Sequence, residues 1–304
     1  MMNIIVFIFI FWLFHYIIVP IIFSIFKYKF LLQSNKHVKL IKESGKWAVV
    51  TGATDGIGRE YCRQLAKIGL NVFLISRDEK KLEITSKELK KCYKIDVMYF
   101  QADFASNSIY ESLKERMKGL DIGVLVNNVG IQQPVVCDFI DIDESFSLSG
   151  IININILSAV MMSKIISAEM SQRKRGIIIN ISSASSLSPL PMAAIYSATK
   201  SFLTHFSLAL NEELSKYGIL VQTVRPFFVQ TKLIAAYRLP KFFMPPVEEF
   251  VESAIRTVGT EGDSFGSLQH SIQGIIVRSI PLFISIKIGK MIFRYFQSGL
   301  KLRE

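Results

Sequence analysis

The chain has 304 residues, half of them hydrophobic, and a formal net charge of +11. The amino-terminal stretch holds part of the apolar excess, and the remaining ~265 residues suit one α/β domain. No repeat, low-complexity segment or nucleic-acid-binding motif accompanies the positive charge, so we expect no nucleic-acid partner and assign the charge to a membrane surface or a phosphorylated ligand.

The first 26 residues contain no Lys, Arg, Asp or Glu and are rich in Ile and Phe. At about 1.5 Å per residue, a helix of this length spans a hydrocarbon core of roughly 30 Å. The basic start, short apolar core and small-residue cleavage site of a signal peptide are not recognisable. We therefore predict a retained transmembrane helix over residues 1–26, with a hairpin or monotopic insertion as the alternative.

A basic segment follows this anchor. It contains five lysines, Lys27, Lys29, Lys36, Lys39 and Lys42. The positive-inside rule places such a flank, and the domain after it, on the cytosolic side of the membrane. We predict a basic linker over residues 27–45 and a catalytic domain over residues 46–270.

Cysteine and histidine are sparse in this sequence. The three cysteines, Cys62, Cys92 and Cys137, have neither metal-binding nor redox spacing, and the four histidines form no ligand pattern. We therefore expect a reducing compartment and no metal site.

A glycine-rich turn follows the first predicted strand, residues 47–50, and precedes a helix over residues 59–68. A strand, a glycine turn and a helix in this order present backbone N–H groups to a pyrophosphate. Gly52 permits the tight turn, Gly56 lets the backbone approach the phosphates, and Gly58 allows close packing of helix on strand. The turn predicts a dinucleotide site.

The second predicted strand, residues 71–76, ends at Arg77. Dinucleotide folds often place an acidic residue near this point to bind a ribose hydroxyl. A basic residue suits a 2′-phosphate instead and favours NADPH. Lys80 and Lys81 either add positive charge there or form a solvated helix face. Asp103, after the next strand, can bind the adenine edge.

Strands and helices alternate through the rest of the domain. We predict helices over residues 79–91, 108–118, 145–170, from 195 onward and 247–258, and strands over residues 96–101, 122–126, 176–182, 220–224 and near 265–270. This alternation predicts a Rossmann-type, doubly wound parallel sheet. Asn127 and Asn128 follow the strand over residues 122–126, at the edge where ligands bind in such sheets. Asn127 is a brace between strands, or both a brace and a wall of the pocket.

Tyr196 and Lys200 lie four residues apart in a helical pattern, so they share one helix face. An ammonium group near a phenol lowers its pKa and favours proton exchange near neutral pH. Ser183, at the end of the preceding strand, can hold a carbonyl oxygen beside the phenol. Asn155 lies among apolar neighbours in a helix and needs a hydrogen-bond partner.

Two apolar segments lie in the carboxyl-terminal part of the chain, one within the predicted domain and one after it. Residues 233–244 can cover a hydrophobic substrate. Residues 274–296 are apolar but interrupted by basic residues and a proline, which favours an interfacial helix over a second span. Packing of this segment against the domain is the alternative.

These motifs together resemble the short-chain dehydrogenase/reductase superfamily over roughly residues 46–270. Thr-Gly-x-x-x-Gly-x-Gly, Asn-Asn-x-Gly, a Ser thirteen residues before Tyr, and Tyr-x-x-x-Lys all occur in order. Thr51-Gly-Ala-Thr-Asp-Gly-Ile-Gly58, Asn153-Ile-Asn-Ile-Leu-Ser158 and Tyr196-Ser-Ala-Thr-Lys200 are similar to a membrane-bound branch. That branch comprises very-long-chain 3-oxoacyl-CoA reductases and related 17β-hydroxysteroid dehydrogenases, which act at the endoplasmic reticulum.

The resemblance implies a catalytic tetrad. Tyr196 would protonate the carbonyl oxygen, Ser183 would bind it, and Lys200 would lower the Tyr196 pKa and hold the ribose hydroxyls. Asn155 would keep a water that relays protons to Lys200. The implied NADP(H)-binding residues are Gly52, Thr54, Asp55, Gly56, Ile57, Gly58, Arg77, Asp103, Asn128, Tyr196, Lys200, Pro226 and Thr231.

The resemblance also implies a function. We expect NADPH-dependent reduction of a lipid ketone, with the 3-oxoacyl-CoA step of very-long-chain fatty-acid elongation as the first hypothesis. A steroid or retinoid dehydrogenase is the alternative, and a membrane-bound scaffold that binds nucleotide without turnover is a third. The expected location is the endoplasmic reticulum membrane, with the domain facing the cytosol and able to form a homodimer.

Overall fold

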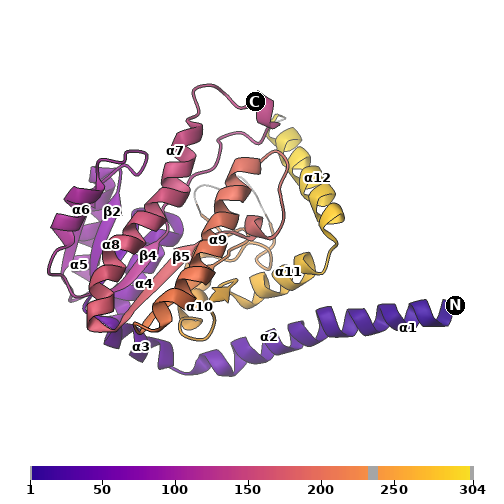
Figure 1. Ribbon diagram of the computed structural model, residues 1–304, viewed down its shortest axis with the longest axis horizontal. Coiled ribbons are helices and arrows are strands. Elements are labelled where there is room, and N and C mark those ends of the chain that lie inside the picture. The colour runs from indigo at the N-terminus through magenta and orange to yellow at the C-terminus, as the bar shows by residue number, and fades with distance from the viewer. Residues whose placement is uncertain (1, 232–238, 302–304) are drawn as a thin grey trace.

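A seven-stranded parallel sheet forms the centre of the molecule in the computed structural model, which describes residues 2–231 and 239–301 (Figure 1). The strands are β1 (Trp47–Thr51), β2 (Asn71–Ser76), β3 (Val97–Gln101), β4 (Ile122–Asn127), β5 (Gly176–Ile181), β6 (Ile219–Val224) and β7 (Asp263–Ser264). Their order is β3-β2-β1-β4-β5-β6-β7. The chain thus winds outward from β1 in one direction and returns through β4 in the other, which confirms the predicted doubly wound fold and places a switch point between β1 and β4.

Helices cover both faces of the sheet. They are α4 (Gly56–Ile68), α5 (Glu79–Cys92), α6 (Tyr110–Met117), α7 (Leu148–Ile152), α8 (Ser158–Arg173), α9 (Ala194–Ser215) and α10 (Val247–Arg256). Successive strand residues point to opposite faces, so Ala48 and Val50 pack with one group of helices while Val49 packs with the other. The strands are apolar on both sides because both sides are buried.

Three predicted elements differ from the structure. Residues 274–296, expected as one interfacial helix, are divided between two helices, Leu268–Arg278 and Leu282–Lys301. The helix expected over residues 145–170 begins at Leu148, and a π-helical turn, Asn153–Leu157, interrupts it. The last strand is Asp263–Ser264, earlier than the predicted residues 265–270. Gly266 has φ +79° and turns the chain out of the sheet, and Ser267 then caps α11 (Leu268–Arg278) by accepting a hydrogen bond from the His270 N–H.

The amino-terminal helices extend from the domain as a long rod (Figure 1). They are α1 (Met2–Leu13), a π-helical turn (Phe14–Ile18) and α2 (Val19–Lys29), and Ile10–Gln33 is long and apolar enough to cross a membrane. A second helical stretch, Leu148–Arg173, passes the same test but forms part of the domain core, since Ile151, Met162 and Ile166 are buried. The predicted linker is mostly ordered, because α3 (Lys36–Ser44) buries Ile41 fully in the core.

The carboxyl-terminal helices divide between two environments. α11 packs along α2. α12 (Leu282–Lys301) turns away from α11 after Pro281 and lies on the side of the domain toward which the rod points (Figure 1).

A proline in the rod leaves one backbone carbonyl without its usual helical partner. Pro20 has no N–H to donate to the carbonyl of Tyr16. The hydroxyl of Ser279, which caps the end of α11, donates to that carbonyl at 3.3 Å. The rod is therefore attached to the domain by specific contacts.

Candidate active site

A cleft of about 720 Å³ opens at the carboxyl ends of β1, β2 and β4. Nine of the predicted cofactor residues line it: Gly52, Thr54, Asp55, Gly56, Ile57, Arg77, Asp103, Asn128 and Thr231. Residues that the sequence analysis did not single out also line it, among them Ser76, Ile131, Gln132 and Gln133. Ser76 ends β2 and the other three follow β4, and only the arrangement of the strands brings them to one edge.

The glycine turn has the backbone geometry that a dinucleotide site needs. Gly52 and Gly56 have φ of +64° and +51°, a region that residues with a Cβ rarely adopt. Gly58 does not line the cleft. A Cβ there would overlap the Gly52 carbonyl and the Asn128 amide, so Gly58 serves the close packing of α4 beneath the turn. The residues present therefore fit a pyrophosphate.

Asn128 holds this turn in place. Its Nδ2 donates to the carbonyls of Thr51 at 3.0 Å and Gly52 at 3.2 Å, while its own N–H donates to Thr51 Oγ1 at 3.0 Å. Asn127 is a brace between strands, because its Nδ2 donates to Asn180 Oδ1 at 2.8 Å and Ser163 Oγ at 3.1 Å. The two adjacent asparagines thus support the site in different ways.

Positive charge collects at the end of β2. Arg77 lines the cleft there, and so does Lys81 on α5, whose Nζ donates to the Asp55 carboxylate at 2.6 Å. Asp55 raises the pKa of Lys81 through this hydrogen bond and ion pair. Of the two lysines in question, Lys81 therefore belongs to the cleft. Asp103 also lines it and accepts from the Ala105 N–H at 2.9 Å.

The structure brings Tyr196 and Ser183 into contact through a side-chain hydrogen bond. Burial raises the pKa of the Tyr196 phenol, and the Ser183 bond opposes that shift. The expected lowering of this pKa by Lys200 is therefore wrong. Lys200 Nζ lies 5.8 Å from the centre of the Tyr196 ring and donates instead to the Ile181 carbonyl at 2.9 Å. The phenol keeps its proton, the form that a proton donor needs.

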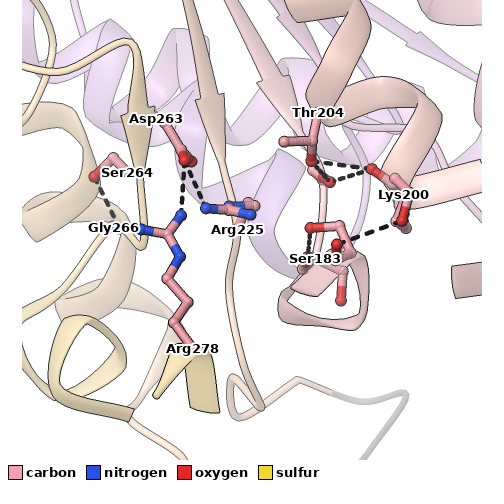
Figure 2. A network of polar contacts seen from close by, with 11 residues as sticks. Ser183, Lys200, Thr204, Arg225, Asp263, Ser264, Gly266 and Arg278 are labelled. Carbon is pink, nitrogen blue, oxygen red and sulfur yellow. Dashed lines mark hydrogen bonds and ion pairs between the residues drawn. The ribbon is translucent and has the colours of Figure 1, made fainter. Parts of the chain in front are cut away.

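Lys200 is buried beneath the end of β5. Its carbonyl accepts from Thr204 Oγ1 at 3.0 Å and from Ser182 Oγ at 2.8 Å (Figure 2). Burial lowers the pKa of the Lys200 ammonium to about 8 because the charged form loses hydration. This side chain therefore changes charge close to physiological pH.

Asn155 lies on the π-helical turn, a feature often found at functional sites. Its Oδ1 accepts from the Ile131 N–H at 2.8 Å, and its Nδ2 donates to the Ile131 carbonyl at 2.8 Å and to Thr199 Oγ1 at 3.0 Å. It thus links the loop after β4 to the helix of Tyr196 and Lys200. The proton relay through a water stays a prediction.

Six predicted residues do not line the 720 Å³ cleft: Gly58, Asn155, Ser183, Tyr196, Lys200 and Pro226. The Pro226 carbonyl accepts from the Ala184 N–H at 2.8 Å, so it supports the segment that begins at Ser183. Thr231 lies over Gly56 and closes the cleft from the other side. Half of the predicted cover, residues 233–238 of 233–244, lies outside the described residues, and of the remainder Met244 is buried while Phe242 and Phe243 are exposed.

Sequence analysis missed an ionic cluster beside β6 and β7. Asp263 accepts from Arg225 at 2.5 Å and from Arg278 at 2.9 Å (Figure 2). Both guanidinium groups lie 5.0 Å from the centre of the Phe265 ring. Arg225 directly precedes Pro226, so this cluster positions the segment that supports Ser183. The three charges are far apart in sequence, and no motif indicates their contact.

The pKa of Lys200 predicts how nicotinamide dinucleotide binding depends on pH. The predicted contact of Lys200 with the anionic dinucleotide would be attractive below its pKa of about 8, where the side chain is an ammonium, and would lose that attraction above it. We expect the dissociation constant of NADPH to rise by up to about tenfold per pH unit above this pKa. Fluorescence titration between neutral and alkaline pH checks this. In Lys200→Gln the alkaline rise should disappear, and an equal slope in both proteins would contradict the assignment.

The chain is similar to known proteins over most of its length. The model of the short chain dehydrogenase family matches residues 46–240. The very-long-chain 3-oxoacyl-CoA reductase of Homo sapiens is 45% identical over 245 residues, which are 80% of this chain and 78% of that protein. The inactive hydroxysteroid dehydrogenase-like protein 1 of Pongo abelii is 39% identical over 263 residues, 85% of this chain and 79% of that protein.

A solved structure shows the same fold with a nucleotide. The short-chain dehydrogenase from Sphingobium yanoikuyae in complex with NADPH is 28% identical, with a TM-score of 0.65. The match covers 72% of this chain and 86% of that one.

Proposed function

We propose, on the premise that this chain belongs to the short-chain dehydrogenase family, that it reduces the ketone of a long-chain 3-oxoacyl-CoA with NADPH. The hydrogen-bonded pair of Tyr196 and Ser183, placed above a buried lysine, carries the proposal. The similarity to very-long-chain 3-oxoacyl-CoA reductases supports the substrate. One relative is called inactive, but this chain has a phenol bonded to a hydroxyl, with a buried lysine 5.8 Å from the centre of the phenol ring.

The chemistry divides among these side chains. Bound NADPH supplies the hydride that the carbonyl carbon accepts. Ser183 donates a hydrogen bond to the carbonyl oxygen and orients the ketone. Tyr196 gives its phenolic proton to the same oxygen as negative charge develops there. Lys200 holds the cofactor's ribose and restores the proton of Tyr196, with Asn155 supporting the relay.

NADPH is preferred to NADH in this proposal because two cations flank the end of β2. Arg77 and Lys81 both line the cleft, and Lys81 is oriented by its ion pair with Asp55. A guanidinium binds a phosphate through charge-assisted hydrogen bonds. NADH has no 2′-phosphate for these groups to bind.

Arg77→Ala should weaken NADPH binding by about tenfold or more, since a hydrogen bond to a charged group contributes roughly 1.5–3 kcal/mol. NADH binding should change little, because Arg77 has no phosphate to contact there. Isothermal titration with both dinucleotides measures the difference. Arg116→Ala, at an exposed arginine on α6, is the matched control. Equal loss of NADH and NADPH binding would rule out the proposed role of Arg77.

The substrate distinguishes the main proposal from its alternatives. In membranes containing the protein, kcat/KM for a long-chain 3-oxoacyl-CoA should exceed that for estrone or androstenedione. A tenfold preference for a steroid, about 1.4 kcal/mol in transition-state stabilisation, would replace elongation with steroid metabolism. NADPH binding with no turnover of any ketone would favour the scaffold hypothesis.

The apolar rod supports attachment to a membrane, and we propose the endoplasmic reticulum membrane with the domain in the cytosol. The lysines after the apolar segment support that orientation. The protein should resist alkaline carbonate extraction, and protease added to intact microsomes should degrade the domain. Protection of the domain until detergent is added would reverse the orientation.

A homodimer completes the proposal. Exposed apolar side chains on α7 and α9, namely Ile152, Phe202 and Leu208, support pairing through this layer of the domain. Sedimentation of the detergent-solubilised protein tests it, and a monomeric mass would contradict it.

A further inference from the structure

The last helix, α12, separates its side chains into three faces. Ser285, Ile286, Gly289 and Phe293 are half-buried and share one helix face, where Gly289 packs against Leu190 of the domain. Ile288 and Lys290 are half-buried as well. An apolar stripe, Ile284, Ile288, Met291, Ile292 and Tyr295, follows the spacing of a second helix face. Met291 and Tyr295 in this stripe are 65% and 75% exposed. A cationic stripe, Lys287, Lys290 and Arg294, lies between these two faces.

This pattern is typical of a helix that lies in a membrane interface. An interfacial helix buries an apolar face at the level of the headgroups and keeps cations beside the lipid phosphates. The charges are of one sign, because residues 264–303 contain no Asp or Glu. Among the helices in the described part of the chain, α12 is not one of those apolar enough to cross a membrane. Its four basic residues favour an orientation parallel to the surface.

The apolar rod fixes where this surface would meet the membrane. α11 connects the two, since Ser271 Oγ bonds the Tyr28 hydroxyl at 3.2 Å and Ser279 bonds the Tyr16 carbonyl. Lys27 pairs with Glu261 just before β7. α12 runs steeply across the direction of α1 and α2, on the side toward which they extend (Figure 1). A bilayer crossed by the rod therefore lies beside α12.

We propose that α12 is a second membrane contact, with its apolar stripe inserted at the interface and its cationic stripe on anionic phospholipid headgroups. This inference rests on the proposed membrane attachment of the rod. It has a consequence for the substrate, because Gly289 packs against Leu190, in the segment between Ser183 and Tyr196. α12 thus brings the bilayer surface to the catalytic segment, so an acyl chain can reach the site from the lipid.

Site-specific fluorescence tests the contact in the full chain. Cys92 and Cys137 are replaced by serine, which leaves only the buried Cys62. A polarity-sensitive dye is then attached to Met291→Cys. Ile84→Cys is the matched control, because Ile84 is a 61% exposed apolar side chain on α5, away from α12. The protein is reconstituted in phosphatidylcholine vesicles with or without about one-fifth phosphatidylserine.

The dye at Met291 should shift to the blue and be quenched by lipids spin-labelled near the headgroup, whereas the dye at Ile84 should not respond. Each cation contributes about a fivefold factor near an anionic surface. Quenching should therefore fall when phosphatidylserine is omitted or when Lys287→Gln, Lys290→Gln and Arg294→Gln are combined. Lys87→Gln, Lys90→Gln and Lys91→Gln on α5 form the control set.

Two outcomes separate the proposals. If the protein resists carbonate extraction but the dye at Met291 behaves like the dye at Ile84, α12 does not contact lipid and the inference is wrong. If carbonate releases the protein, the proposed anchor is wrong. If the dye at Met291 is also unquenched, both the anchor and the contact of α12 with lipid are wrong.

Discussion

Tyr196→Phe should lower kcat for ketone reduction by at least about 10²-fold, the low end of general acid catalysis. The substitution keeps the ring and removes only the hydroxyl that Ser183 contacts. Burial keeps the phenol protonated, so in this proposal the phenol is the proton donor of the pair. Single-turnover kinetics with saturating NADPH measure the loss directly.

The control for this variant is Tyr217→Phe, which removes the same atom from a 40% exposed tyrosine beyond the end of α9. Its turnover should equal that of the unmodified protein. NADPH affinity should remain nearly normal in both variants. Turnover above about one-tenth of normal in Tyr196→Phe would remove the phenol from the mechanism.

Asp263→Ala should lower the free energy of unfolding by about 3 kcal/mol. The Arg225 side chain is only 5% exposed and would lose the carboxylate that compensates its burial. Removing one partner of a buried pair is costly because it leaves a buried charge unpaired. For a chain of this size, the melting temperature should fall by about 6–12 °C.

Glu252→Ala provides the matched control. Glu252 pairs with Arg256 at 2.6 Å, with side chains 49% and 37% exposed. Exposed pairs within one helix contribute only about 0.3–0.5 kcal/mol, so this variant should melt nearly normally. Circular dichroism in detergent, at one fixed scan rate, compares the melting temperatures of the two variants. Equal shifts in the two variants would show that burial does not distinguish the pairs.

Local physics made several features of the site predictable from sequence. Gly52 and Gly56 need positive φ, which glycine alone adopts readily. Tyr196 and Lys200 share a face because of helix periodicity. The order of strands and helices follows from alternating apolar segments, and the sheet confirms it. Each of these inferences needs only neighbouring residues.

The boundaries of elements, and the ion pairs between distant segments, were not predictable in this way. Sequence placed a strand at residues 265–270, although the cap formed by Ser267 begins a helix there. The sequence indicated that Asn155 needs a hydrogen-bond partner. That its partners are Ile131 and Thr199 depends on how three elements meet. Asp263, Arg225 and Arg278 come together only because β7 pairs with β6 and α11 folds back on both.

The class of fold and the dinucleotide turn follow from local sequence patterns, and the resemblance of the motifs implies the four proposed catalytic side chains. The proton states of Tyr196 and Lys200 depend on the folded chain, because desolvation depends on the surrounding packing. Burial raises the Tyr196 pKa and lowers that of Lys200 to about 8, against the expected effect of lysine on tyrosine. The tertiary structure also shows that the apolar rod meets the domain through α11. Contacts such as that of Ser279 with the Tyr16 carbonyl join residues at opposite ends of the chain.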